Sequence, residues 1–298
     1  QTFLKYGITP LSIIEYDYGY KVFGASSYVP VVKYEGCMPM IINTDFQGNT
    51  FKPFYPYDIY NLNEYKDKYF NLSTMHNNNI ACNNRYFNAF IKEKVELDEN
   101  ISKPRSHIII SCFDTTGEII WRNGYDTLNN NQDLKKHYLQ CIKLTPEKTL
   151  LLLLRLYNIN NGKFVDTRIK LLEISLSGKM INEFHFNSET REFTPIDIAI
   201  KESGSYILLG MYIQSENNYF FIWEINEESK VVKTQLLPSK YVFIDYQGIT
   251  LLKESGFLIH GITCINDPDP NDIYDNVNKL FLYKMKNDFT FDWEFEWY

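Results

Sequence analysis

The sequence has no long hydrophobic run and no cluster of basic residues. Its one run of leucines covers residues 150–154, whereas a membrane-spanning helix needs ~18 apolar residues in succession. The formal net charge is −7, and the densest basic pair, Lys135-Lys136, stands alone. Because nucleic-acid binding needs clustered Lys and Arg, the sequence predicts no nucleic-acid partner and no transmembrane segment.

Closely spaced cysteines are also missing. The chain has five, and the nearest two, Cys112 and Cys141, are 29 positions apart, which excludes CxxC zinc and redox motifs. A chain of 298 residues buries roughly three quarters of its unfolded surface, so it does not need a disulfide framework. We expect free, mostly buried thiols that pack as small apolar residues.

The motifs of common catalytic sites are absent. The five histidines are dispersed without an HExxH or HxH pair, and the sequence has neither a GxSxG nucleophile motif nor a phosphate-binding loop. His260 stands inside an apolar run, at the place that Leu209 takes in a similar run, so we expect a packed, hydrogen-bonded histidine. The sequence predicts no cofactor.

Aromatic and β-branched residues dominate what is present. The chain has 23 Tyr and 21 Phe, with Ile and Val in short bursts, and almost no long periodic helical segment. Such residues suit pleated, half-buried surfaces, so the sequence predicts an all-β protein.

The sequence repeats itself at intervals of about 50 residues. The tetrapeptide Lys-Glu-Ser-Gly occurs at 201–204 and again at 253–256, and each copy precedes an apolar run that ends in glycine, at 206–210 and 257–261. A divergent copy begins at Glu15. The turn glycine would supply the positive φ that tight hairpins require.

A second hairpin with a polar turn follows in each unit. These turns lie at 45–49, 114–118, 175–179, 226–230 and 286–289. The pattern predicts one domain, residues 1–298, folded as a β-propeller of four-stranded antiparallel blades. It predicts five blades, or six if the segment 50–107 contains extra strands.

The weakest unit of the repeat is the second. There we expect a hairpin from strands 72–75 and 80–82. In every unit the first strand should be innermost and the last strand, with tails such as 121–125 and 292–298, outermost. The segment 1–7 resembles a further outer strand that helps to close the ring.

These turns resemble the repeats of bacterial secreted or lipoprotein β-propellers. In those repeats a Gly-Gly-Tyr hairpin precedes a Lys-Thr-Asp-x-x-Gly-Asn hairpin and an outer-strand Trp. Residues 43–49 match best, followed by 114–118 with Trp121. The resemblance implies an exported protein of the cell envelope, in the periplasm or associated with the outer membrane as a lipoprotein. The start at Gln1 without Met agrees with a removed leader and a lipid anchor upstream. We expect a monomer.

One acidic loop is a weak candidate for a cation site. Asp267, Asp269 and Asn271 place oxygen ligands at alternate positions, as Ca²⁺ requires. However, the position that should hold glycine is Asp272 and the one that should hold glutamate is Asn278, which favours a solvated loop.

Aromatic side chains are the remaining signal of function. Residues 51–60 hold five aromatics and two prolines, typical of an edge or inter-blade segment, although exposed aromatics can also contact sugars or a partner protein. The leading hypothesis is a non-enzymatic binding or scaffold module for a protein or glycan ligand. The alternative is a polysaccharide-acting enzyme, a glycosidase or lyase with carboxylates at the propeller channel. Buried carboxylates with raised pKa values would favour the enzyme, and a shallow surface lined by aromatics would favour binding.

Overall fold

The structure is a computed structural model, and all of its described elements are β-strands. Among the described residues, no helix is long and apolar enough to cross a membrane. The described residues are 8–16, 19–26, 38–47, 49, 72–73, 79–98, 101–115, 118–125, 134–160, 163–187, 193–214, 217–238, 243–253, 256–266 and 276–297.

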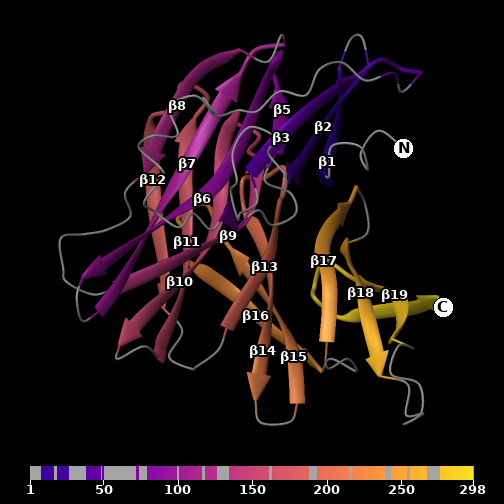
Figure 1. Cartoon of the computed structure of the whole chain (residues 1–298). Helices are drawn as coiled ribbons and strands as arrows, with labels where there is room; N and C mark the ends of the chain where they lie inside the picture. The colour runs from indigo at the N-terminus through magenta and orange to yellow at the C-terminus, as the bar shows by residue number, and fades with distance from the viewer. Residues whose placement is uncertain are drawn as a thin grey trace. The chain divides into compact units, whose positions relative to one another are not determined.

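The strands form five sheets in succession along the chain (Figure 1). Three sheets have four strands, the first is described with three, and the second has four strands in line with β5 paired beside them. Each sheet is an up-and-down antiparallel blade, so the predicted all-β propeller is confirmed, with five blades.

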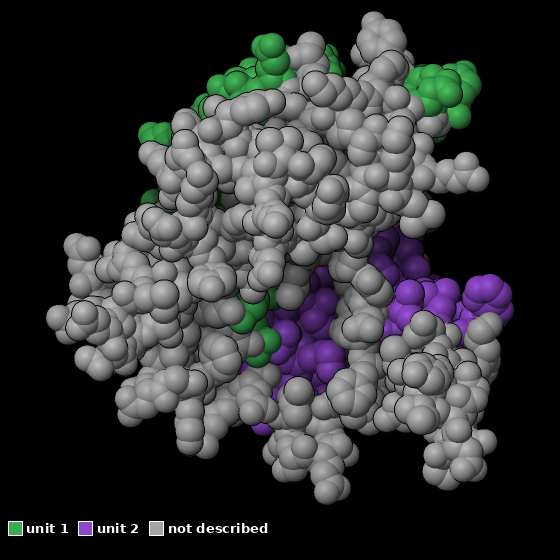
Figure 2. Space-filling model, viewed as in Figure 1, with its two compact units in different colours: residues 1–144, 148–185 green, residues 145–147, 186–298 purple. Residues whose placement is uncertain are grey.

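The chain divides into two compact units, residues 1–144 with 148–185 and residues 145–147 with 186–298 (Figure 2). The first unit contains three blades. The first blade is built from β1 (Ile8–Tyr16), β2 (Gly19–Ser26) and β3 (Met38–Thr44). The second is built from β4 (Leu72–Ser73), β5 (Asn79–Cys82), β6 (Arg85–Asp98), β7 (Ile101–Phe113) and β8 (Ile119–Tyr125). The third is built from β9 (Leu134–Leu144), β10 (Thr149–Asn160), β11 (Lys163–Ser175) and β12 (Met180–Asn187).

The second unit contains the fourth and fifth blades. Each runs in simple strand order from its first strand to its last. They are built from β13 (Phe193–Ile200), β14 (Tyr206–Gln214), β15 (Asn217–Ile225) and β16 (Val231–Pro238), and from β17 (Phe243–Leu252), β18 (Gly256–Asn266), β19 (Asn276–Met285) and β20 (Phe291–Trp297).

The second blade differs from the sequence prediction. Strands β4 and β5 do not pair with each other, because both pair with the long strand β6. The hairpin turn lies instead at Asn83 and Asn84, with φ of 52° and 57°. Two successive left-handed residues are the requirement of a type I′ turn, and asparagine tolerates that conformation better than most residues. The predicted hairpin at 72–82 is therefore wrong.

The polar turns of the second hairpins share one geometry in all five blades. In each, the first residue of the turn donates its backbone N–H to the carbonyl oxygen of the fifth, as Asp45 does to Asn49 at 3.0 Å. In the three turns whose fourth residue the structure describes, that residue takes a positive φ, which is 85° at Gly178, 60° at Ser229 and 66° at Phe289. The repeat therefore conserves the shape of the turn even where glycine is lost.

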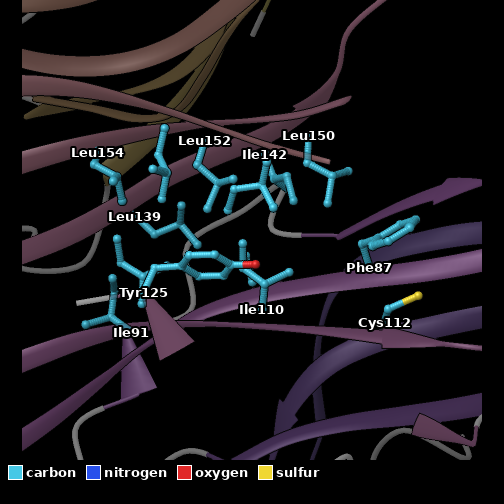
Figure 3. Close-up of a cluster of buried hydrophobic side chains, with 14 residues drawn as sticks. Phe87, Ile91, Ile110, Cys112, Tyr125, Leu139, Ile142, Leu150, Leu152 and Leu154 are labelled. Carbon is cyan, nitrogen blue, oxygen red and sulfur yellow. The ribbon is translucent and has the colours of Figure 1, made fainter. Parts of the chain in front are cut away.

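Each unit has its own hydrophobic core. In the first unit, β6 and β7 contribute Phe87 and Ile110, and β9 and β10 contribute Leu139 and Leu152, to a cluster that also contains the buried thiol of Cys112 (Figure 3). In the second unit, the core joins the fourth and fifth blades. Its buried members are Ala199, Ile207, Leu209, Phe220, Ile222, Ile249, Phe257, Ile259, Phe281, Tyr283, Met285 and Phe289.

The cysteines behave as the sequence predicts wherever the structure describes their side chains. Cys112 and Cys141 are buried, and Cys82 is a half-buried free thiol. Burial raises the pKa of the Cys112 thiol to about 11, so it stays protonated and unreactive at neutral pH.

Candidate functional site

The predicted cation site and aromatic segment cannot be placed. Asp267, Asp269 and Asn271 lie outside the described residues, as do residues 51–60. Within the described ranges, no group of three or more His, Cys, Asp or Glu side chains is arranged to hold a metal ion.

The last strand of the fifth blade carries a row of exposed aromatic side chains. Trp293, Phe295 and Trp297 alternate along β20 and lie opposite Lys284, Leu282 and Leu280 on β19, so they share one face of the sheet. Their exposed fractions are 41%, 51% and 66%. A β-bulge at Asp292 shifts the register, so Phe291 lies opposite the buried Met285 on the other face, with its ring 6.1 Å from that of Tyr283. We call Trp293, Phe295 and Trp297 the aromatic row. At the rise of an extended strand, the row is about 13 Å long.

No comparable row exists on the described last strands of the second, third and fourth blades. The large hydrophobic side chains that those strands expose are aliphatic or methionine. They are Ile119 and Ile120 on β8, Met180 and Ile181 on β12, and Val231, Val232 and Leu236 on β16. Sequence reasoning identified the tail 292–298 only as an outer strand, although its strict aromatic–acidic alternation could have revealed the row.

The apolar surface continues from the aromatic row across the sheet. Trp297 lies opposite Leu280 on β19, and Phe295 lies opposite Leu282. Leu282 in turn lies opposite His260 on β18. Directly paired residues share a face, so this surface is the one opposite the core face of the fifth blade, which buries alternate residues such as Phe281.

A polar cluster lies on β17 and β18, the first two strands of this sheet. His260 Nε2 is 3.2 Å from the Thr250 hydroxyl oxygen, as expected of a packed, hydrogen-bonded histidine. Gly248 lies between this ring and Asp197: a Cβ at position 248 would come within 2.7 Å of His260 Cε1 and 3.3 Å of Asp197 Oδ2. Only glycine leaves space for both side chains at this point.

Asp197 joins the first strands of the fourth and fifth blades. Its side chain is 3% exposed, its Oδ1 accepts the backbone N–H of Ile198 at 2.9 Å, and its Oδ2 accepts that of Ile249 at 3.2 Å. Both carboxylate oxygens thus hold backbone groups in place. This geometry suits a structural link between strands better than delivery of a proton to a substrate.

Two of the described carboxyl groups, those of Glu183 and Asp288, have lowered pKa values. Burial alone would raise the pKa of Glu183, but the ammonium of Lys170 and the ring of His185 outweigh burial and lower it. Hydrogen bonds from Thr290 lower the pKa of Asp288. A catalytic proton donor requires a raised carboxyl pKa, and both of these shifts are in the opposite direction.

A buried lysine in the first unit is the other unusual polar group. Lys21 is 2% exposed, its Nζ donates to Asn43 Oδ1 at 2.8 Å, and it lies 4.8 Å from the centre of the Tyr86 ring. Burial lowers its pKa, and the charge of Asp114 offsets part of this shift. Its burial leaves little room for a substrate, which suggests a structural role.

Comparisons with known proteins find a similarity of fold but no similar sequence. No protein-family model matches the sequence, and no curated protein matches it. Among solved structures, a Trypanosoma rangeli sialidase in complex with the inhibitor DANA has a TM-score of 0.56 at 8% identity, covering 93% of this chain and 47% of the sialidase. A PL25 ulvan lyase bound to -[GlcA(1-4)Rha3S]- has a TM-score of 0.53 at 9% identity, covering 84% of this chain and 61% of the lyase.

This chain therefore spans about six tenths of the lyase and about half of the sialidase. At such low identity the likeness concerns the fold alone. It supports the β-propeller architecture that the five sheets display.

Proposed function

We propose that this chain is a binding module that holds a protein or glycan ligand against the aromatic row without transforming it. The observation that carries the proposal is the exposure of three aromatic side chains on one face of one strand. Large exposed apolar patches mark interaction sites on soluble proteins, and Trp provides a rigid apolar body with a polar N–H. The row is specific to the fifth blade among the last strands that the structure describes.

The structural neighbours support a glycan as one ligand class. By their names, the sialidase holds an inhibitor and the lyase is bound to an oligosaccharide. A row of aromatic rings about 13 Å long would allow sugar rings to stack in succession.

The proposal is tested with the purified protein on a glycan array and in titrations followed by tryptophan fluorescence. We expect a ligand to change the emission of Trp293 or Trp297. The double variant Trp293→Ala/Trp297→Ala should lose binding, whereas Ile119→Ala, on the exposed surface of β8, should retain it. Analysis of the bound material should find no product, and turnover of any ligand would contradict the non-enzymatic function.

The second candidate is a polysaccharide-acting enzyme, and the polar cluster favours it. Asp197, on the first strand of the fourth blade, and His260, on the second strand of the fifth, lie near each other around Gly248. Gly248 itself is on a first strand, which a propeller places nearest its channel. The variants His260→Ala and Thr250→Ala would distinguish the two candidates, because an enzyme should lose turnover while its unfolding midpoint stays nearly unchanged.

Export to the cell envelope and a lipid anchor upstream of Gln1 remain predictions from the resemblance. Cell fractionation and mass spectrometry of the mature N-terminus would test both.

A further inference from the structure

The last strands of three blades pair with their neighbours in the same way. In each of them a β-bulge follows the first paired residue, and the bulged residues are Ile120 in β8, Val232 in β16 and Asp292 in β20. Positions can therefore be compared between these blades by counting from the bulge. The residue directly after the bulge is Trp121 in β8, Lys233 in β16 and Trp293 in β20.

One face of β8 holds the second hairpin turn of the third blade. Trp121 Nε1 donates to the carbonyl oxygen of Leu176 at 3.1 Å. The carbonyl oxygen of Gly178 accepts two bonds, from Asn123 Nδ2 at 3.0 Å and from the Tyr125 hydroxyl at 2.6 Å. This face of β8 therefore binds a β-hairpin turn through the backbone carbonyl groups of the turn.

The equivalent face of β16 contacts the second hairpin turn of the fifth blade. Lys233 Nζ lies 4.4 Å from the centre of the Phe289 ring, and Phe289 is the fourth residue of that turn. Further along the same face, Leu237 packs against the core cluster that contains Phe289. In both blades, the same positions of the last strand thus contact a hairpin turn of the next blade.

The residue after the bulge matches the fourth residue of the turn that it contacts. A Cβ at Gly178 would lie 2.5 Å from Asn123 Nδ2 and 3.1 Å from Trp121 Cε3, so the turn has no room for a side chain there. Where the turn carries Phe289 instead, the contacting residue is Lys233, whose ammonium interacts with the ring. Tryptophan after the bulge is therefore paired with glycine, and lysine is paired with phenylalanine.

The aromatic row occupies these same positions in β20. Counting from the bulge, Trp293 corresponds to Trp121, and Trp297 corresponds to Tyr125. Tyr125, which holds a turn, is 9% exposed, whereas Trp297 is 66% exposed. The fifth blade thus has the face that binds a turn in the second blade, and this face is open to solvent.

We propose that the aromatic row binds a β-hairpin turn of a partner protein, five residues long and with glycine at its fourth position. This inference rests on the proposed function, because it specifies the ligand of the aromatic row. The glycine of the turn lies against the indole ring of Trp293, as Gly178 lies against that of Trp121. The indole N–H groups of Trp293 and Trp297 donate to carbonyl oxygens of the turn.

A protein turn fits this face better than a glycan. On β19 the aromatic row is paired with Leu280 and Leu282, which extend the apolar surface and offer no hydrogen bond to sugar hydroxyls. The equivalent residues of β7, Ile108 and Ile110, are fully buried in the core cluster that the second blade shares with the third. This face therefore has the composition of a surface that packs against another β-sheet.

The experiment uses the whole chain and three cyclic peptides. Backbone-cyclised hairpins of about ten residues serve as probes, because an open two-stranded hairpin is only marginally stable in water. The first peptide carries the turn Ser-Leu-Ser-Gly-Lys of the third blade, residues 175–179. The second replaces the glycine of this turn by phenylalanine, which Phe289 shows to be compatible with a positive φ at that position. The third contains the residues of the first in scrambled order. Binding is measured by calorimetry and by tryptophan fluorescence.

We expect the glycine peptide to bind at least about tenfold more tightly than the other two peptides. The variant Trp293→Lys should reverse the preference toward the phenylalanine peptide, since Lys233 contacts Phe289 in this way. The matched control Phe291→Lys introduces lysine on the other face of the same strand and should leave the preference unchanged. Trp293→Phe retains a ring but removes the N–H, so it should weaken binding of the glycine peptide roughly two- to tenfold.

Other outcomes would overturn the inference. Equal binding of the glycine and phenylalanine peptides would exclude the match between Trp293 and glycine, and equal binding of the scrambled peptide would exclude recognition of a turn. If no peptide binds but a polysaccharide binds through Trp293 and Trp297, the ligand is a glycan and only the proposed function survives. If a soluble quencher cannot reach these two tryptophans in the isolated chain, the chain itself or a second copy covers the row, and both proposals fail. Both also fail if neither class of ligand binds.

Discussion

The Oδ2 atom of Asp197 accepts the backbone N–H of Ile249 at 3.2 Å, although 52 positions separate the two residues. The bond joins the first strand of the fourth blade to the first strand of the fifth. Asp197 is 3% exposed and Ile249 is 5% exposed, so water cannot readily replace either partner. A buried N–H without an acceptor costs free energy, which makes this carboxylate a structural link between blades.

Replacing this carboxylate should destabilise the second unit. We expect Asp197→Ala to lower the free energy of unfolding by about 3 kcal/mol, because two buried N–H groups lose a charged acceptor. Urea denaturation would measure the change. Glu228→Ala is the control: Glu228 contacts Lys230 on an exposed turn, and its loss should cost under about 0.5 kcal/mol. An Asp197→Ala protein of unchanged stability would refute the structural role.

The sequence predicts the blades better than it predicts the contacts between them. Hairpin turns are local, so the glycines of the Lys-Glu-Ser-Gly copies correctly predict positive φ, with values of 83° at Gly204 and 105° at Gly256. The turn at Asn83 and Asn84 escaped prediction because it lacks glycine. The contact around Gly248 involves residues from three strands that lie apart in the sequence, so no local sequence pattern predicts it.

The aromatic row shows the same limit. Alternation along 293–297 predicts which residues share a face, but it reveals neither the β-bulge that puts Phe291 on the other face nor whether the shared face is buried or exposed. The structure decides this, since the opposite face of β19 holds Phe281 in the core.

Gly256 should be far more sensitive to substitution than Gly124. A Cβ at Gly256 would lie 1.9 Å from the carbonyl oxygen of Met285, and the φ there is 105°. We expect Gly256→Ala to cost at least about 2 kcal/mol in thermal or urea unfolding. At Gly124 nothing lies within 4 Å of a new Cβ, so Gly124→Ala should leave stability unchanged or raise it by up to about 1 kcal/mol. If Gly256→Ala and Gly124→Ala lost the same stability, the close approach of the backbone at Gly256 to the Met285 carbonyl oxygen would be refuted.

Lys21 should make the stability of the protein depend on alkaline pH. Burial lowers its pKa below 10.5, so the folded protein binds that proton less tightly than the unfolded chain. The cost of burying the charge is present at neutral pH and is relieved as the pH rises from the folded pKa toward 10.5.

We therefore expect Lys21→Met to be as stable as the wild type or more stable at pH 7, by about 1 kcal/mol. This advantage should shrink as the pH approaches 10.5, as chemical denaturation at a series of pH values would show. Lys253→Met, which removes an exposed turn lysine, controls for the change in net charge. A difference between Lys21→Met and the wild type that stays constant with pH would contradict the interpretation.

Glu183 should have the opposite pH signature. Lys170 Nζ lies 2.6 Å from its Oε1, and so does His185 Nε2. Its pKa is lowered from 4.5, so its contribution to stability is complete above that value and is lost as the pH falls through the folded pKa. We expect Glu183→Gln to lower the free energy of unfolding at pH 7 by about 1–2 kcal/mol, because Lys170 is fully buried.

Acid denaturation would test this pair. As the pH falls below the lowered folded pKa, the protonated wild-type side chain comes to resemble glutamine, so the difference between Glu183→Gln and the wild type should disappear there. The double variant Lys170→Met/Glu183→Gln should recover much of the loss at pH 7, since it removes the buried ammonium together with its partner. If the double variant instead loses the sum of the two single effects, Lys170 and Glu183 contribute independently and the ion pair does not determine this part of the third blade's stability.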